Sequence, residues 1–232
     1  MFIRSLIPLV VLVALTGCVT TEPVVSLAGN YYEESSQEET TVVLIGEIPA
    51  AQLLFPGADC LLCIAAAKTM HTSLNDHVKS LDLNDFQGIG PKVLSGLSQQ
   101  GIKASRYSDP SILKDLEKYP GYSSKENFAK LDYRPLQEQL KGDYLLLIEI
   151  LGGGIKRNFA SYIPTAEPVG FFNARVALVN LTSNEYALNR VFNQAVSSDG
   201  EWKDSPSYPA LTTSLYQAIT DAENAILEAL EL

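Results

Sequence analysis

Two cysteines, Cys60 and Cys63, are the residues of this chain whose type and spacing best suit a chemical role. A thiol at the start of a helix gains reactivity because the free N–H groups of the first turn stabilise its thiolate. Asp59 is placed to cap such a helix, but the residues between and after the cysteines are apolar, which raises the pKa of a thiol. Three states therefore stay open: a structural disulfide, two buried free thiols, or a redox-active pair.

The sequence offers little else for catalysis or metal binding. Zinc binding by Cys60, Cys63, His71 and His77 would require the helix to break near Thr69. A single helix would separate Cys63 and His71 by about 12 Å along its axis, too far for one zinc ion. No Gly-x-Ser-x-Gly elbow and no complete phosphate-binding loop are present. We therefore expect no catalytic residue, no metal site and no cofactor, and we expect His71 and His77 to be partly exposed residues of a helix.

One loop combines basic and aromatic residues. It places the only adjacent basic pair of the chain beside two aromatic side chains, in the order Lys156, Arg157, Phe159 and Tyr162. Such a loop suits contact with a partner. The alternative is a solvated loop whose aromatic side chains pack back on the sheet. The chain as a whole carries 17 Lys and Arg against 27 Asp and Glu, a net charge of −10, which argues against binding to nucleic acid.

The amino terminus has the pattern of an export signal, with Arg4 followed by a short apolar run. The motif Leu15-Thr16-Gly17-Cys18 resembles the bacterial lipoprotein signal. The resemblance implies that Cys18 is acylated, with palmitate-like chains, and becomes the first residue after processing. In the Gram-negative sorting rule that this resemblance implies, Asp after the cysteine retains a lipoprotein at the inner membrane. Residue 19 is Val, which favours the outer membrane. An ordinary secretory signal with an incidental cysteine is the alternative.

These features divide the chain into three parts. Residues 1–17 are the predicted signal peptide, and residues 18–41 are the lipidated cysteine followed by an acidic, flexible tether. Residues 42–232 are expected to form a single α/β domain in the periplasm, in which the segment 49–89 has no assigned role. No stretch after the signal is long and apolar enough to span a bilayer.

The spacing of apolar residues predicts an α/β fold of the α+β type. Its core is a mixed sheet of about five strands flanked by helices. The expected strands are 42–48, 102–107, 144–151, 171–181 and 185–196, the last two forming a hairpin. Short helices are expected at 91–100, 111–118 and 134–140, and a long amphipathic helix begins at Pro209.

Residues 90–230 resemble the α/β domain of lipoproteins related to the curli secretion channel and to the activators of penicillin-binding proteins. The matching features are Lys141-Gly142-Asp143-Tyr144 at the entry to an aliphatic strand, the alternating run Val176-Ala177-Leu178-Val179, and the closing helix. The chain departs from the channel family between Leu151 and Phe171, where about 20 residues are too few for two membrane-crossing strands and a turn. Pore formation is therefore not expected.

The function expected from the sequence is that of a lipid-anchored, non-enzymatic protein at the outer membrane, facing the periplasm. It would bind or position a protein partner as an assembly or scaffold factor. The alternative is a periplasmic enzyme or redox protein that uses Cys60 and Cys63.

Overall fold

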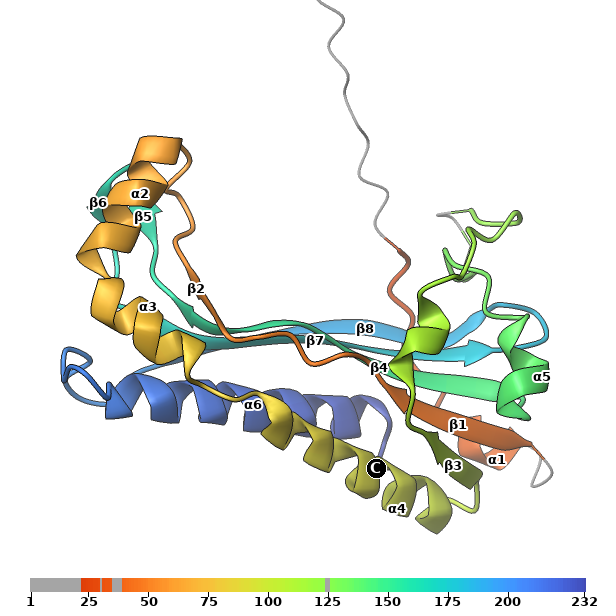
Figure 1. The fold of residues 1–232 in the computed structure, drawn as a ribbon. Helices are drawn as coiled ribbons and strands as arrows, with labels where there is room; N and C mark the ends of the chain where they lie inside the picture. The colour runs from red at the N-terminus through yellow and green to blue at the C-terminus, as the bar shows by residue number, and fades with distance from the viewer. Residues whose placement is uncertain (1–21, 30, 35–38, 124–125) are drawn as a thin grey trace, which may run out of the picture.

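A computed structural model describes residues 22–29, 31–34, 39–123 and 126–232. The predicted signal and Cys18 lie outside these residues. The protein is built on a mixed sheet with the strand order β3-β1-β4-β7-β8, and helices flank the sheet (Figure 1). The predicted mixed α/β fold is confirmed, as is the long helix near the carboxyl end of the chain.

Parallel and antiparallel pairs divide the sheet into two halves. Strand β1 (Thr40–Ile45) lies between β3 (Lys103–Tyr107) and β4 (Tyr144–Lys156), and it is parallel to both. Strand β7 (Val169–Asn180) is antiparallel to β4 and forms a hairpin with β8 (Tyr186–Ser197). The aliphatic residues of β4 explain its central place, because both faces of this strand are covered over most of its length.

Strand β4 is longer than the sequence predicts. It does not end at Leu151, where the ladder has an irregularity, but continues through Gly152, Gly153 and Gly154 to Lys156. Along this extension it pairs with the short strand β2 (Gln52–Leu54). Gly154 has a φ of +142°, and a Cβ placed on it would lie 2.0 Å from the carbonyl oxygen of Gln52. The glycines thus allow β2 to approach, and they do not terminate the strand.

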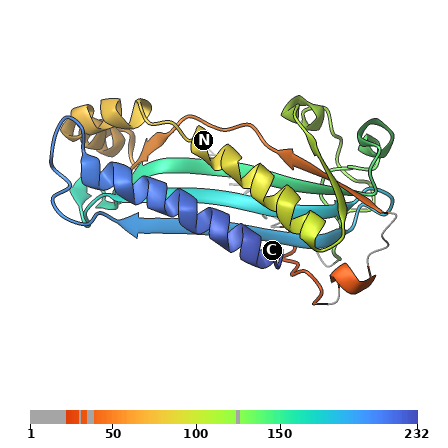
Figure 2. The same ribbon diagram turned by 90° about the horizontal axis from the view of Figure 1, so that it is seen from below.

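Helices α4 (Ile89–Gln99) and α6 (Pro209–Ala229) cover one face of the sheet, as Figures 1 and 2 show. Helix α6 lies across β7 and β8, and its contact with β7 is close at one point. A Cβ on Gly170 would lie 2.3 Å from the backbone nitrogen of Leu215. The Gly170 amide instead donates a hydrogen bond of 3.1 Å to Ser214 Oγ. Glycine is therefore required where helix and sheet meet.

Two apolar clusters fill the sheet's two sides. The larger lies between the sheet and the helices, and its fully buried members include Phe86, Leu146, Ile148, Phe172 and Leu215. The smaller lies on the opposite face, which we call the open face, beneath the segment that holds the 3₁₀ helix η2 (Pro110–Leu113) and helix α5 (Leu136–Leu140). The open face is covered by this cluster at one end of the sheet.

The segment 49–89, which the sequence left unassigned, forms β2, α2 (Leu61–Met70), α3 (Thr72–Lys79) and the 3₁₀ helix η1 (Asn84–Gly88). Helix α2 packs with the two-residue strands β5 (Phe159–Ala160) and β6 (Ile163–Pro164). Figure 1 shows α2, β5 and β6 rising together from the open-face side, away from α4 and α6. We call α2 with the β5–β6 hairpin the tip.

The described residues between 22 and 41 lie against the domain. Val25 and Asn189 exchange two backbone hydrogen bonds of 3.0 and 2.8 Å, and Tyr32, in helix α1 (Tyr31–Glu34), donates to the carbonyl of Leu230. Where it is described, the expected tether is therefore docked on the protein, although the division of the chain at residues 17 and 41 stays a prediction. Within the described ranges, no helix combines the length and apolar character that crossing a bilayer requires.

Candidate functional site

The structure joins Cys60 and Cys63 by a disulfide, with their Cα atoms 4.9 Å apart. Helix α2 begins directly after Cys60, whose sulfur accepts a hydrogen bond of 2.9 Å from the amide of Cys63. Cys60 is therefore the N-terminal cap, and the expectation that Asp59 fills this place is wrong. A sulfur atom can take the position because it accepts the amide that a carboxylate would otherwise accept.

Cys63 faces inward from the tip. It is buried with Ala58, Ala67 and Phe159, and Phe55 packs against this small cluster. Phe159 is only 6% exposed, so the prediction that it belongs to a contact surface does not fit its position. Its ring instead fills the space between the β5–β6 hairpin and helix α2. For Phe159, the structure therefore agrees with the alternative that the aromatic side chains of the loop pack inward.

Arg157 is also committed to contacts within the protein. Its guanidinium lies 4.9 Å from the ring centre of Trp202, and its Nε donates a 2.8 Å hydrogen bond to the carbonyl of Ala166. Its Nη1 lies 2.8 Å from Nε2 of His71. Of the four residues of the predicted contact loop, Lys156 is half-buried and Tyr162 is exposed. The contact role of the loop stays a prediction. Of its four residues, Tyr162 has the most accessible side chain.

His71 is buried at the junction of α2 and α3, so its expected partial exposure is wrong. Its Nδ1 lies 2.8 Å from the carbonyl oxygen of Ala67, and since a carbonyl only accepts, Nδ1 carries the hydrogen. The Nε2 atom then accepts from Arg157. Burial lowers the pKa of His71; the Ala67 hydrogen bond acts in the opposite direction, and the Arg157 charge lowers it further. This histidine is thus a neutral structural acceptor.

His77 is half-buried, as expected, and also has a structural partner. Its Nε2 lies 2.8 Å from the hydroxyl of Thr212, and that hydroxyl donates to the carbonyl of Tyr208. Because the Thr212 hydrogen is used in this way, His77 donates to Thr212 and does not activate it. Among the described residues, no group of three or more His, Cys, Asp or Glu side chains is arranged to hold a metal ion.

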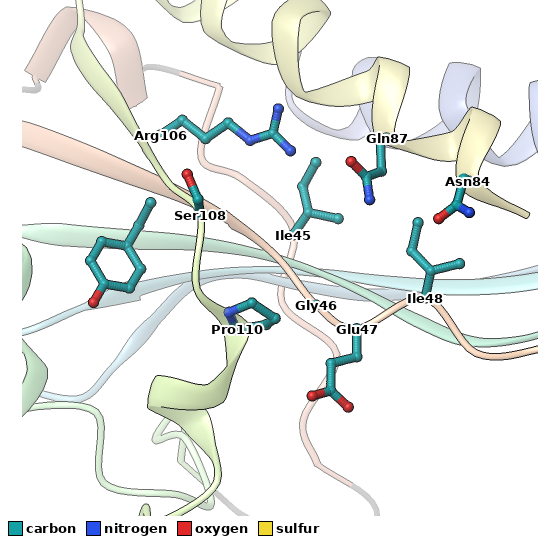
Figure 3. A pocket seen from close by; sticks show the side chains of 10 residues that line it. Ile45, Gly46, Glu47, Ile48, Asn84, Gln87, Arg106, Ser108 and Pro110 are labelled. Atoms are coloured by element: carbon teal, nitrogen blue, oxygen red, sulfur yellow. The ribbon is translucent and has the colours of Figure 1, made fainter.

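A cavity of about 380 Å³ opens where strands β1 and β3 end. Figure 3 shows the side chains of Arg106 and Gln87 directed into the same space above Ile45, whereas Glu47 points away on the other side. Asn84 and Ser108 add an amide and a hydroxyl to the lining. These groups combine one positive charge with several hydrogen-bonding groups, a composition that suits a polar or anionic group.

A second cavity of about 240 Å³ adjoins the first and shares Gly46, Glu47 and Pro110 with it. It lies between the end of β1 and Ile150 of β4. After β1 the chain runs to β2 and the tip before it returns through η1 and α4 on the helix-covered face, whereas after β3 it continues to η2 and α5 on the open face. Diverging connections of this kind open a crevice at the carboxyl ends of neighbouring parallel strands, which is a common position for ligands. Lys114 and Glu47 form an ion pair of 2.7 Å at its border.

The sequence did not identify the two cavities. Their residues come from segments that are distant in the chain, such as Asn84, Arg106 and Glu149, and only the parallel pairing of β1 with β3 and β4 brings these segments together. The sequence did contain a positional signal, because Ser108 directly follows the predicted strand 102–107 and Glu47 lies near the end of the predicted strand 42–48. Polar residues at such positions become informative once the strands are known to be parallel.

The open face carries a second polar feature that the sequence did not indicate. The Arg175 guanidinium contacts Glu22 Oε2 at 2.7 Å, Glu149 Oε2 at 3.0 Å and Asn189 Oδ1 at 2.8 Å. Burial alone would lower the pKa of Arg175, but Tyr186, Glu22 and Glu149 more than offset it, so the net pKa lies above its ordinary value. This cluster fixes residue 22 to the sheet.

The comparisons with solved structures find only distant likenesses. The lipoprotein GNA1162 from Neisseria meningitidis is 11% identical, with 78% of this chain and 99% of that chain covered at a TM-score of 0.35. A putative neuraminyllactose-binding hemagglutinin homolog from Helicobacter pylori is 12% identical over 91% and 90%, at 0.33. The hypothetical protein CT253 from Chlamydia trachomatis is 10% identical over 79% and 96%, at 0.31.

No family model matches the chain, and no curated protein is similar to it. The resemblance to the curli secretion channel and to the activators of penicillin-binding proteins stays a prediction. Since every TM-score above is below 0.5, these likenesses carry no functional argument, and any function has to be argued from the chain's own residues.

Proposed function

We propose that this chain is a lipid-anchored protein of the bacterial outer membrane that binds a protein partner and catalyses no reaction. The observation that carries the proposal is the attachment of Glu22 to Arg175 on the open face. Only residues 19–21 separate Glu22 from the expected acylated Cys18, and four chain steps reach at most about 14 Å. The anchor would therefore hold the sheet close to the bilayer.

The anchor itself is supported by the sequence. A diacylated or triacylated cysteine holds a protein on a membrane stably, because each buried methylene contributes about 0.8 kcal/mol. Val19 favours the outer membrane, and the periplasmic side is the simplest place for a domain attached in this way. With so short a connection, the domain is held near the membrane in a restricted set of orientations.

A binding role is supported by the chemistry of the described side chains. Both histidines donate or accept hydrogen bonds that hold elements together. The cavities at the strand ends contain Arg106 and amides suited to recognition, and their acidic residues Glu47 and Glu149 are paired with Lys114 and Arg175.

The anchor is tested by the change Cys18→Ser in the full chain, expressed in a Gram-negative host. The parent should be labelled by radioactive palmitate and recovered with outer-membrane vesicles, and the variant should lose both properties. The double variant Cys60→Ser, Cys63→Ser is the matched control, since it alters two cysteines and leaves the signal intact. Palmitate labelling of the Cys18→Ser chain at the parent's level would contradict the proposal.

A further inference from the structure

We propose that the tip is a second membrane contact, which inserts apolar side chains into the surface of the bilayer that holds the lipid anchor. This inference rests on the proposed anchor at Cys18. It adds a part of the folded domain to the membrane-binding surface, and it assigns a role to the segment around Cys60 and Cys63.

The first observation is the exposure of apolar side chains at the tip. Leu61 and Leu62 are 88% and 82% exposed, more than any other large apolar side chain of the described residues. Tyr162 and Ile163, at the turn of the neighbouring hairpin, are 63% and 56% exposed. Adjacent exposed leucines beside an aromatic residue are costly in water and are typical of surfaces that bind proteins or lipids.

The second observation is that these side chains belong to one well-supported structure. The Ser161 hydroxyl donates to the sulfur of Cys63 at 3.3 Å, and the Ser161 amide donates to the carbonyl of Gly57 at 3.0 Å. Phe159 packs against Cys63 beneath them. The disulfide and these contacts hold the start of α2 beside the hairpin, so Leu61, Leu62, Tyr162 and Ile163 cannot easily fold back into the core.

The third observation selects a lipid surface as the occupant. Glu22 is fixed on the open face by Arg175, and the proposed anchor lies within about 14 Å of it along the chain. Figure 1 shows the tip rising on the side of the sheet opposite α4 and α6. Glu22 lies on this same side, because its partner Arg175 and the neighbouring Glu149 are on the open face. A bilayer that Cys18 enters is therefore on the side toward which the tip projects.

The charge of the tip agrees with this occupant. Within the tip, Lys68 is the one charged residue, and the adjoining residues 55–60, 156–158 and 165–167 add Lys156 and Arg157 against Asp59 and Glu167, in a chain whose net charge is −10. The tip thus avoids the excess of acidic residues found elsewhere, and so the anionic headgroups of a bacterial membrane repel it less than they repel the rest of the chain. Tyr162 has the amphipathic ring that membrane interfaces favour.

The test uses the full chain, expressed with its own signal, extracted from membranes and reconstituted into vesicles of phosphatidylethanolamine and phosphatidylglycerol. The variant Leu62→Trp adds a fluorescent reporter to the tip, and the parent, which contains Trp202 alone, supplies the background. Ser98→Trp, at an exposed position of α4, is the matched control on the opposite side of the sheet. Tyr162→Trp is a second tip reporter, should Leu62→Trp fail to fold.

We expect the added emission of Leu62→Trp to shift to shorter wavelength and to be lost when the vesicles carry brominated acyl chains. The emission of Ser98→Trp should show neither change. Protein that floats with the vesicles but shows the same unquenched emission from both variants overturns the tip contact and leaves the anchor standing. Failure of the parent to float overturns both.

Other occupants give different results. If a second copy of the chain covers the tip, Leu62→Trp emission shifts to shorter wavelength without quenching by brominated lipid, and cross-links form between the tips of two copies. If a different protein covers it, the emission shifts only when envelope proteins are present. Either result overturns the lipid contact.

Discussion

The side chains of Arg157 and His71 meet at 2.8 Å, and this contact ties the end of β4 to the junction of α2 and α3. His71 can accept from the guanidinium only while its Nε2 is unprotonated. The contact therefore connects the position of the tip to the protonation of one buried imidazole.

The stability of the tip should fall at acid pH. Because the pKa of His71 in the folded protein lies below its ordinary value, the unfolded chain binds the proton more tightly. Stability is then full above about pH 6.5, the unfolded value, and is lost as the pH falls through that value toward the folded pKa. We expect hydrogen exchange in α2 and α3, taken relative to the intrinsic amide exchange rate at each pH, to increase as the pH falls below about 6.5.

His71→Gln supplies the comparison for this prediction. Its amide oxygen retains an acceptor for Arg157 but does not titrate, so the increase in exchange should be smaller than in the parent. His77→Gln is the matched control on α3, because burial lowers the pKa of His77 too but His77 does not contact Arg157. An equal response to pH in the parent and in His71→Gln would show that other groups control the tip.

Loss of Arg175 should destabilise the protein strongly. Arg175→Met leaves the carboxylates of Glu22 and Glu149 without their cation in a poorly solvated place, which costs about 3–5 kcal/mol when such a pair is fully buried and less here. Glu22→Gln should cost less, yet it should make residues 22–29 more susceptible to protease. Urea unfolding and limited proteolysis measure the two effects.

The exposed pair of Lys114 and Glu47 provides the control for Arg175. Lys114→Met removes a cation from a surface ion pair, so the unfolding midpoint should stay close to that of the parent. If Arg175→Met unfolds at the same urea concentration as Lys114→Met, the Arg175 cluster does not fix the amino-terminal segment to the sheet.

The contact between β7 and α6 should tolerate no added side chain at Gly170. Gly170→Ala places a methyl group 2.3 Å from the Leu215 nitrogen, so the helix or the strand has to move, at a cost of about 1–3 kcal/mol or more. Gly88→Ala is the matched control, since no atom lies within 4 Å of the new methyl group. Thermal unfolding should separate the two variants by several degrees, and equal midpoints would contradict the close packing.

Partner binding should depend on Arg106 if the strand-end cavity is a recognition site. Arg106→Ala should reduce the amount of partner that the full chain captures from envelope extracts, without changing the melting temperature. Arg190→Ala is the matched control, because Arg190 is equally exposed and lies outside the cavity. Identical capture by both variants would place the binding surface elsewhere.

A double variant, Lys156→Ala with Arg157→Ala, would not test the predicted contact loop cleanly, because Arg157 also holds the tip in place. It removes the partner of His71 and the cation over Trp202, so a weakened capture would reflect a loosened tip as well as lost surface charge. Lys156→Ala alone is therefore the better test of the predicted contact loop.

The sequence was sufficient where local pattern decides the structure. The aliphatic residues of β4, the alternation in β7 and β8, and the three- and four-residue spacing in α6 all indicated their elements. These patterns are strong because each element buries a continuous face against the same core. Pro209 marked the beginning of α6 to the residue, whereas α4 begins at Ile89, two residues before the predicted start at Pro91.

The sequence was insufficient where distant segments decide the structure. Gly152–Gly154 has the composition of a strand end, but β2 pairs with it and extends the strand. Phe159 and His71 are buried because α2 and the β5–β6 hairpin cover each other. These elements are short, so their sequence patterns do not predict that they pack together. The arrangement of the strand-end cavities depends on the parallel order of β1, β3 and β4, which is not encoded locally.

The position of β1 has a consequence for how the chain acquires its structure. β1 pairs with β4, and the Thr40 amide also donates to the carboxylate of Asp143, 103 residues later in the chain. Closing so long a loop is slow, whereas β7 and β8 are joined by a short turn and close quickly. We therefore expect β1 to join the sheet late, after β4 has been synthesised. If the proposed signal exports the chain, this delay keeps it unfolded while it crosses the inner membrane.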